Sequence, residues 1–553
     1  MVSWGNPKIP VVAGVCAALG VFALVPPAGN GTAATPVVRH VALGGNNGNP
    51  CTMSRPCASF ARAYQAAAPG DVVEVAGGSY PAQTLPADPA KTSTADVVFR
   101  PAAGASVSLA GFASGNDKTG VGAKHFELRD LQIAGFVSIA WGTADVTLRN
   151  IDAGSLKLTS TREVRVYGGD YGPWTDGISH INACGVPGCF PAEDILIEGA
   201  LFHDFTITDP DKHSECLMIW PGRRVTIRNS TFRNCTDFDV LVKPYNTSLV
   251  GSPADILFEN NFLDAPMPGE TATASCNPGC PRGGNAIAIT DGSADPWSGA
   301  VIRYNSTLGG IRIDPAVANV VVKGNIAARS SAFACRTSGV ISHNVWSGVK
   351  CSPSDRLAAL SDVFVDATAF DLRLTATSQA IGAGDPDDHP ARDIAGRLRP
   401  EAYAPDAGAW QREPALVVAG RAIGTAKIGM TRTDVVEFYG PPRKRTRERL
   451  VDGSSVEVGH HRVRGGTLRV TLRDERVIAI STTSGYYRTL KGLGPTSPLR
   501  ARANDSWACR PVGAKIGKAR LYVRPTHSKK PVVAELVVVA RGFVPSCAIV
   551  EKP

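Results

Sequence analysis

The pentapeptides FELRD (Phe126–Asp130), VTLRN (Val146–Asn150) and VTIRN (Val225–Asn229) belong to a repeated set that decides the fold. In each, the first and third residues are apolar, and the fifth is a residue that tolerates a left-handed backbone. A period of two places the apolar side chains on one face of a strand, and the fifth residue allows a sharp turn. Six more segments share the pattern: VRVYG (Val164–Gly168), ILIEG (Ile195–Gly199), ILFEN (Ile256–Asn260), VIRYN (Val301–Asn305), VVVKG (Val320–Gly324) and VISHN (Val340–Asn344).

Strands that repeat with turns of this kind predict a solenoid of parallel strands. We expect the fifth residues to stack in one line, with asparagines exchanging side-chain hydrogen bonds along it. That predicted line comprises Asn150, Gly168, Gly199, Asn229, Asn260, Asn305, Gly324 and Asn344. A second strand set lies between the first, so each coil holds at least two strands: Gly177–His180, Glu215–Trp220, Asp239–Lys243, Asn285–Thr290 and Gly310–Asp314.

Both ends of the repeat have recognisable features. Ser59 to Ala68 reads as an amphipathic helix that would cover the first open coil. With Pro56–Phe60, Gly78–Tyr80 and the closing segments Asp371–Leu374 and Asp406–Trp410, residues 40–410 resemble secreted bacterial proteins of the pectate-lyase-like superfamily. The resemblance implies a right-handed parallel β-helix, within an all-β fold class. It leaves the activity open, since the superfamily includes lyases, hydrolases, epimerases and adhesins.

The chain divides into four predicted parts. Residues 1–34 read as a signal peptide, because Lys8 precedes an apolar run from Val11 to Val25 and small residues follow it; an uncleaved anchor is the alternative. The β-helix spans 35–410 and a linker 411–420. A smaller basic α+β domain follows at 421–553, with a helix that Thr431 caps and Gly440 ends. Its Ile428–Pro442 segment resembles the module of outer-membrane assembly lipoproteins and β-lactamase-inhibitor proteins, which implies binding.

Twelve cysteines remain after the signal segment, and an even number behind such a signal predicts disulfides in an oxidising compartment. Proximity alone gives the predicted pairs; for Cys276 and Cys280, zinc is the alternative. The pairs are Cys51–Cys57, Cys184–Cys189, Cys216–Cys235, Cys276–Cys280, Cys335–Cys351 and Cys509–Cys547.

Charge is unevenly distributed. Residues 411–553 hold 27 Lys and Arg against 11 Asp and Glu, a net of +16, so the whole-chain value of +9 leaves −7 for residues 1–410. The basic part would attract polyanions such as wall polymers or acidic polysaccharides. Export makes cellular nucleic acid an unexpected partner, and we expect no stable membrane span. Arg443–Arg449 is the densest cationic run, and a solvated loop is its simpler interpretation.

Aligning the second strand set by its first residues puts Asp176, Glu215, Asp239 and Asn285 in one predicted column, with about 4.8 Å between coils. His180 and Lys243 fall in another column four residues on. Three stacked carboxylates would repel one another unless a cation, a basic side chain or protonation relieves them; calcium is the candidate cation, at Asp176, Glu215 and Asp239. Substrate contacts are predicted for Asp176, His180, Trp220, Tyr245 and Asn285, the aromatic pair by stacking on sugar rings.

The resemblance implies lyase-type cleavage of an acidic polysaccharide. Several lyases of this superfamily use a Lys or Arg base beside calcium, a role that falls on Lys243 with Glu215 and Asp239 beside it, and with His213 or His180 as assisting acid or base. A glycoside hydrolase would instead use two of the carboxylates. The alternative function is a non-catalytic cell-surface or polysaccharide-binding protein, since Asp and Asn at strand starts often only cap turns.

Overall fold

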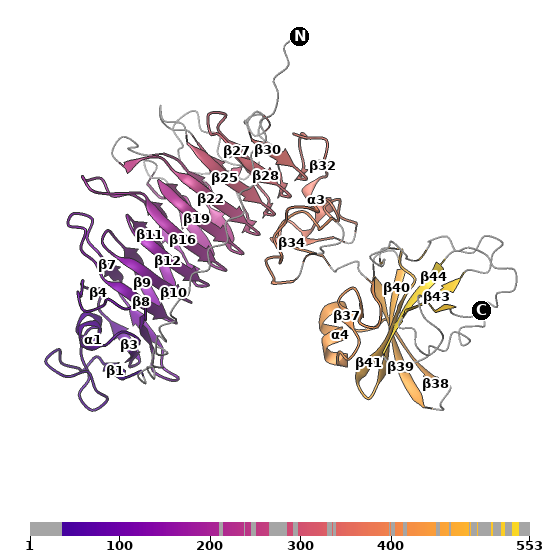
Figure 1. Cartoon of the computed structure of the whole chain (residues 1–553), viewed down its shortest axis with the longest axis horizontal. Coiled ribbons are helices and arrows are strands. Elements are labelled where there is room, and N and C mark those ends of the chain that lie inside the picture. The colour runs from indigo at the N-terminus through magenta and orange to yellow at the C-terminus, as the bar shows by residue number, and fades with distance from the viewer. Residues whose placement is uncertain are drawn as a thin grey trace, which may run out of the picture. The chain divides into compact units, whose positions relative to one another are not determined.

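The computed structural model shows a stack of parallel coils followed by a separate antiparallel sheet (Figure 1). It describes residues 36–209, 214–236, 238–244, 250–264, 285–290, 297–328, 335, 339–375, 377–397, 399, 404–412, 417–449, 454–463, 466–485, 487, 495, 510–511, 521–525 and 533–540. The predicted signal peptide, His213, Tyr245, Cys276, Cys280, Cys509 and Cys547 lie outside these residues. No helix among the described residues is long and apolar enough to cross a membrane.

The first sheet of the solenoid contains the repeated pentapeptides, and all of its twelve strands are parallel. Residues at the first and third positions, such as Val146 and Leu148, are fully buried, as the period of two predicts. In order, the strands are β1 (Val38–Val41), β2 (Val72–Val75), β5 (Val97–Pro101), β8 (Lys124–Arg129), β10 (Ala144–Arg149), β12 (Arg162–Tyr167), β16 (Ala192–Glu198), β19 (Gly222–Arg228), β22 (Ala254–Glu259), β25 (Ser298–Arg303), β28 (Val321–Lys323) and β30 (Val340–Ser342).

The second sheet of the solenoid follows the first around each coil. Two of its strands, β9 (Gln132–Ile139) and β11 (Asp152–Thr159), are long enough to contribute to the third sheet as well. The remaining members are β3 (Gly78–Tyr80), β6 (Val107–Leu109), β13 (Asp170–Tyr171), β14 (Trp174–Thr175), β17 (Leu201–Thr206), β20 (Thr231–Cys235), β23 (Phe262–Leu263), β26 (Ser306–Thr307), β29 (Ile326–Ala327), β31 (Val345–Trp346) and β32 (Arg356–Leu357).

The third sheet corresponds to the predicted second strand set. Its strands are parallel. The second halves of β9 and β11 lie between the earlier strands of this sheet, which end with β7, and the later ones, which begin with β15. They are β4 (Gln83–Leu85), β7 (Phe112–Ser114), β15 (His180–Asn182), β18 (Leu217–Trp220), β21 (Val240–Val242), β24 (Asn285–Ile289) and β27 (Gly310–Ile313). Three parallel sheets around one apolar core confirm the predicted parallel β-helix.

The line of turn residues is confirmed in most coils and wrong in two. Asn150, Asn229 and Asn260 have φ of 50°, 52° and 54°, in the left-handed region. In two coils, however, Tyr304 and His343 take that position with φ of 54° and 59°, in place of Asn305 and Asn344. The register Arg303↔Lys323↔Ser342 shows why: the buried residue that matches Ile256 is Ala300, so VIRYN and VISHN were aligned one residue late.

Asn305 and Asn344 instead belong to a buried ladder one residue beyond the turn line, formed with Asn261 and Asn325. In Asn305, Asn325 and Asn344, Oδ1 accepts hydrogen bonds from the backbone N and from Nδ2 of the asparagine one coil earlier, at 2.9–3.0 Å, while Oδ1 of Asn261 accepts from the backbone N of Ser230 at 2.9 Å. At the end of the ladder, Oδ1 of Asp355 accepts from the backbone N of Asn344 at 2.9 Å. The predicted exchange of amide hydrogen bonds therefore occurs, but inside the solenoid.

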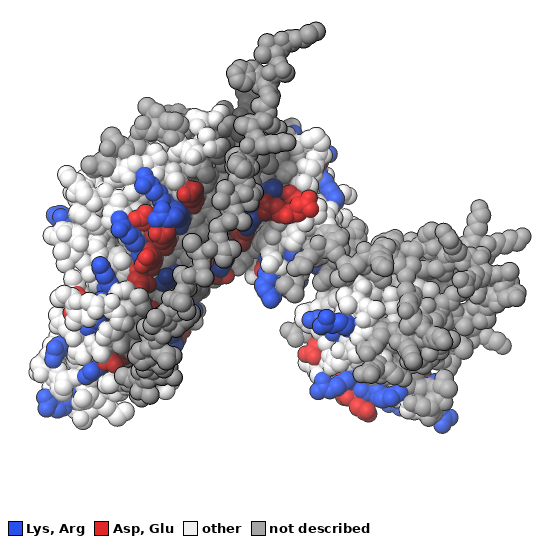
Figure 2. Space-filling view, in the orientation of Figure 1, with Lys and Arg blue, Asp and Glu red and all other residues white. Residues whose placement is uncertain are grey.

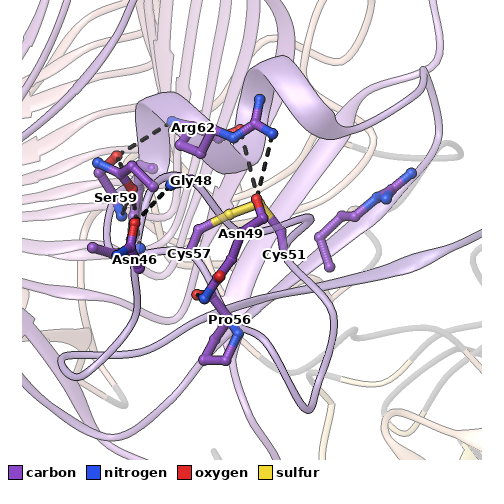
Figure 3. Close-up of a disulfide and its surroundings, with 12 residues drawn as sticks. Asn46, Gly48, Asn49, Cys51, Pro56, Cys57, Ser59 and Arg62 are labelled. Carbon is purple, nitrogen blue, oxygen red and sulfur yellow. Dashed lines mark hydrogen bonds between the residues drawn. A yellow bond between two sulfur atoms is a disulfide. The ribbon is translucent and has the colours of Figure 1, made fainter.

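Helix α1 (Phe60–Ala66) covers the first coil, as predicted. Ser59 caps it by accepting a hydrogen bond from the backbone N of Arg62, and Phe60 stacks on Phe99 with ring centroids 4.9 Å apart. The disulfide Cys51–Cys57 lies beside the helix, where Nη2 of Arg62 donates to the carbonyl of Asn49 at 3.3 Å (Figure 3). The helix and its flanking loop thus form one braced cap.

Four predicted disulfides are formed among the described cysteines. Their Cα–Cα distances are 4.7 Å for Cys51–Cys57, 5.4 Å for Cys184–Cys189 and for Cys216–Cys235, and 4.8 Å for Cys335–Cys351. After the coils, α3 (Leu360–Val363), β33 (Phe364–Asp366) and β34 (Asp371–Leu374) pack into a second apolar cluster with Phe364 and Leu372.

The described residues of the C-terminal part form two antiparallel sheets and one helix. Helix α4 (Arg432–Tyr439) has the predicted boundaries: Thr431 and Asp434 form a capping box, and Gly440 ends it. The small sheet is β35 (Val417–Val418), β36 (Ala422–Ile423) and β37 (Ala426–Lys427). The seven-stranded sheet is β38 (Lys444–Arg449), β39 (Ser455–Val463), β40 (Gly466–Arg473), β41 (Arg476–Thr482), β42 (Arg510–Pro511), β43 (Leu521–Pro525) and β44 (Val533–Val539).

Candidate functional site

The outward side chains of the third sheet form the surface that the sequence singled out, and we call it the third-sheet face. Leu156 and Leu158 of β11 point into the core, so Lys157 between them points outward. The register continues from Lys157 to His180, Met218, Leu241, Ala288 and Arg312 on the following strands. With about 4.8 Å between strands, this column from β11 to β27 is about 24 Å long.

A second outward column lies two residues further along each strand. Asn182 pairs with Trp220, and the backbone N of Lys243 donates to Ile219 at 3.1 Å, which places Lys243 next to Trp220. The ammonium of Lys243 lies 4.8 Å from the centroid of the Trp220 ring. A cation over an indole face is held by the ring quadrupole. The Lys243 charge is therefore held in place by the half-buried ring of Trp220.

His180 is neutral at physiological pH. Burial and, to a smaller degree, the charge of Lys157 lower the pKa of His180 to about 4, and its Nε2 lies 3.3 Å from Oγ1 of Thr159. Burial also lowers the pKa of Lys157, whose Nζ lies 4.1 Å from the centroid of the Phe136 ring. The face therefore combines two lysines, each over an aromatic ring, with an uncharged imidazole.

The predicted carboxylate column is not in register. Leu217 pairs with Val240, so Asp239 lies opposite Cys216 and not opposite Glu215, and Lys243 lies beside Trp220 and not in the column of His180. Asn285 starts β24 and pairs with Gly310. Asp176, with φ of 54°, accepts hydrogen bonds from the backbone N atoms of Thr208 and Asp209 at 2.6 and 2.9 Å, so it caps a turn.

Glu215 and Asp239 have no exposed surface, whereas Lys243 and Trp220 are half-buried. The register brings Trp220 and Lys243 together and leaves His180 in the neighbouring column. The functional roles assigned to these residues, including the calcium ligands, stay predictions.

A group that sequence reasoning missed lies on the first sheet. Asp96, His125 and Asp145 stand at the starts of three consecutive strands, and one donor atom from each lies within 4.8 Å of the others. Among the described residues this is the group of three whose donors could hold a metal ion. Nδ1 of His125 lies 2.6 Å from Asp145, and Nη1 of Arg165 lies 3.0 Å from the same carboxylate. Burial, then Asp145 and Glu127, raises the pKa of Asp96 to about 6.

The group belongs to a larger column of left-handed residues that continues through Glu163, Asp194, Arg224 and Asp255. The signal was present in the sequence, because a polar residue precedes the first apolar position in each of these pentapeptides. Arg224 bridges two of its neighbours, with 2.6 Å to Asp194 and 2.8 Å to Glu193. Figure 2 shows acidic and basic side chains gathered over this part of the solenoid.

No protein-family profile matches the chain, and no curated protein matches it. Three solved structures are similar in fold. A pectate lyase, Pel9A, is 16% identical over 68% of this chain and 97% of its own, with a TM-score of 0.34. PfbA, a surface adhesin of Streptococcus pneumoniae, is 12% identical over 52% of this chain and 75% of its own (TM-score 0.30), and a rhamnogalacturonan lyase is 11% identical over 66% and 95% (TM-score 0.28). These scores carry no argument about activity, and the comparisons give no support to the resemblance of the C-terminal module.

Proposed function

We propose that the protein is an exported β-helix protein whose third-sheet face binds an acidic polysaccharide. The observation that carries this proposal is the pair Lys243 and Trp220, where an aromatic ring holds a cation at a half-buried surface. Lys243 forms no salt bridge with any residue that the structure describes, so its charge is available to a ligand carboxylate. Lys157 and Arg312 supply further positive charges along the adjacent column.

The parallel stack suits a polymer as ligand. Met218, Leu241 and Ala288 in the middle of the outward column are buried, so an extended chain laid along the face would meet the charges of Lys157, Lys243 and Arg312 at separate points. Lysine ammoniums can pair with uronate carboxylates, and aromatic rings such as Phe136, which is 39% exposed, offer an apolar surface to sugar rings.

Burial favours binding over cleavage. A lyase of the predicted kind needs Glu215 and Asp239 beside Lys243 and open to substrate, whereas both carboxyl groups have 0% exposed surface. A proton acceptor must lie within hydrogen-bond reach of the proton that it removes. We therefore propose binding as the function and keep lyase activity as the result that would overturn it.

The disulfides support export. Cys51–Cys57, Cys184–Cys189, Cys216–Cys235 and Cys335–Cys351 are formed in the structure, and such bonds persist in oxidising compartments. We propose an extracellular or cell-surface location on this ground.

The test is calorimetric binding to polygalacturonate. Lys243→Gln should weaken binding about three- to tenfold, as expected for losing a charge-assisted contact worth about 0.7–1.4 kcal/mol. Lys118→Gln is the matched control. Lys118 is exposed on a loop of the same solenoid, and its substitution removes the same charge. Equal weakening in both variants would show that the effect comes from net charge alone and not from this site. Unsaturated products released from a panel of polyuronates would instead establish a lyase.

A further inference from the structure

The C-terminal sheet holds a pocket that is distinct from the third-sheet face. It has a volume of about 530 Å³ and is lined by Arg443, Lys444, His460, His461, Arg462 and Thr467, together with the apolar and backbone atoms around the β39–β40 turn. The size suits a ligand of one or two sugar-sized units. The charged residues of this lining that the structure describes are all positive.

The strand register explains why these cations gather. Lys444 of β38 pairs with His460 of β39, and His460 pairs with Arg469 of β40, so three basic residues stand side by side across the sheet. Arg462 lies two residues beyond His460 and therefore on the same face. Lys444 and Arg462 therefore place two positive charges on one face, and both would attract a bound anion.

The pocket cations are available for a ligand. Arg443, Lys444 and Arg462 are exposed, and none forms a salt bridge with another residue that the structure describes. Arg469 differs, because its guanidinium lies 2.8 Å from Glu448 and 3.9 Å from Glu535. Acidic partners are thus present on the sheet, but they neutralise Arg469 and not the three pocket cations.

His461 gives an independent indication of a ligand. His461 lines the pocket, and only 3% of its surface is exposed. The carbonyls of Gly440 and Tyr439 act on one side of the imidazole, and its Nδ1 is buried without a hydrogen-bond partner of its own among the described residues. A buried polar atom that lacks a partner costs free energy, about 1–3 kcal/mol in typical cases, and a ligand atom or a bound water would satisfy it.

We propose that this pocket binds an oxyanion carried by an acidic polymer, through Arg443, Lys444 and Arg462 with His460 and His461 as additional donors. Arginine presents a planar set of N–H donors that matches carboxylate and phosphate groups. Both anions offer this chemistry, so the experiment uses one polymer of each kind. The site lies apart from the third-sheet face, so it gives the protein a second anchoring point.

The two histidines make the site sensitive to pH. Burial, then Arg469 and Lys444, lowers the pKa of His460, and Glu535 opposes this; Oγ1 of Thr446 lies 3.3 Å from its Nε2. Burial lowers the pKa of His461, opposed by the carbonyls of Gly440 and Tyr439 and reinforced by His460 and Arg445. Both imidazoles are therefore neutral near pH 7. Acidification adds positive charge to the pocket, and a bound anion favours that protonation, so affinity should rise as pH falls.

The experiment measures binding of the full-length protein to polygalacturonate and to poly(glycerol phosphate) at low salt. The pocket variant Arg443→Gln/Lys444→Gln is compared with the control Lys427→Gln/Arg447→Gln, which removes one Lys and one Arg from exposed positions outside the pocket. We expect the pocket variant to weaken binding about tenfold or more to at least one polymer, and the control variant about twofold or less. Arg462→Gln provides a second pocket variant if the double variant fails to fold. The polymer that shows the effect identifies the anion as carboxylate or phosphate.

A second measurement separates this proposal from the function proposed for the solenoid. Wild-type affinity should rise about threefold or more from pH 7.5 to pH 5.5, and His460→Gln should reduce this rise, whereas Lys243→Gln on the third-sheet face should leave it unchanged. Equal weakening by the pocket and control pairs would overturn the pocket and leave only diffuse attraction. So would the absence of binding to both polymers, or a pH response that persists undiminished in His460→Gln.

Discussion

The buried asparagine ladder yields a prediction whose size follows from its hydrogen bonds. Asn305 has no exposed surface, and its Oδ1 accepts from the backbone N and Nδ2 of Asn261 at 3.0 and 2.9 Å. Its Nδ2 donates to Phe258, Arg303 and Asn325 at 3.0–3.1 Å. Asn305→Ala removes all of these at once, inside the apolar core.

The cost can be estimated bond by bond. The backbone N of Asn261 loses its side-chain acceptor and is left buried, which costs about 1–3 kcal/mol. Nδ2 of Asn261 keeps its bond to Ile227 at 2.9 Å, and Oδ1 of Asn325 keeps the backbone N of Asn305 at 3.0 Å, so these groups lose only part of their bonding. Adding about 1 kcal/mol for each of two such losses gives about 3–5 kcal/mol of local stability.

Hydrogen exchange is the suitable assay, because coils of a solenoid open locally and a global unfolding transition would average over them. Amides of β22, β25 and the following turns should exchange about 10² to 4 × 10³ times faster in Asn305→Ala, because 1.4 kcal/mol corresponds to a tenfold change. Asn229→Gly is the matched control: it also deletes an asparagine amide, but one at the left-handed turn, with a single bond of 3.2 Å to Glu198. Protection in Asn305→Ala that stays within threefold of wild type, or that falls no further than in the control, would refute the reasoning.

Three further predictions concern other parts of the solenoid. Asp96→Asn should stabilise the protein at pH 7 by about 1 kcal/mol after allowance for solvent screening: the folded pKa of about 6 lies above the usual 3.8, so this carboxyl group favours folding below pH 3.8 and loses that contribution as pH rises through 6. Thermal melts at pH 4 and 7 check it, and an equal gain at both values would contradict it. Trp220→Ala should weaken polygalacturonate binding about as much as Lys243→Gln, and the double variant should be weaker than either single variant by no more than about twofold, because the ring acts by holding the ammonium; binding calorimetry on the set of variants measures this, and full affinity in Trp220→Ala or additive losses in the double variant would exclude the role. Removing the 19-residue link through Cys216→Ser/Cys235→Ser should lower stability by about 3 kcal/mol in urea titrations, and unchanged midpoints would show that the bond adds nothing.

The sequence predicted the solenoid because its signal is redundant. Seven of the nine pentapeptides are in the predicted register, since an apolar residue at positions one and three and a left-handed residue at position five reinforce one another. VIRYN failed because Val301 and Ile302 are both apolar, so the pattern permits two alignments one residue apart. The structure selects the alignment that buries Ile302 and leaves Tyr304 at the turn. A slip of one residue reverses which side chains face the core.

The same ambiguity is larger in the third sheet, where loops of unequal length precede each strand. Aligning Asp239 with Glu215 assumed that both residues begin a strand, but β18 begins at Leu217 and β21 at Val240. Their pairing shifts Lys243 into contact with Trp220 and leaves the carboxyl groups buried. Loop length carries no register information, because the entropy of closing a loop changes only slowly with its length. The residue types on this face were predictable, and their neighbours across coils were not.

The pocket in the basic domain also could not be predicted from the sequence. Arg443–Arg449 is the densest run of charge in the sequence, and it forms β38, where side chains alternate between the two faces of the sheet. Only Arg443 and Lys444 reach the pocket, whereas Arg445 lies 3.7 Å from Glu457 and is partly neutralised. His460, His461 and Arg462 come from β39, and the two histidines carry no signal in a count of cations at neutral pH. A polyanion that responded to charge density alone would be released equally by any pair of neutralised residues. One that responds to geometry would be released by Arg443→Gln/Lys444→Gln and retained by Lys427→Gln/Arg447→Gln, and the pocket predicts the second result.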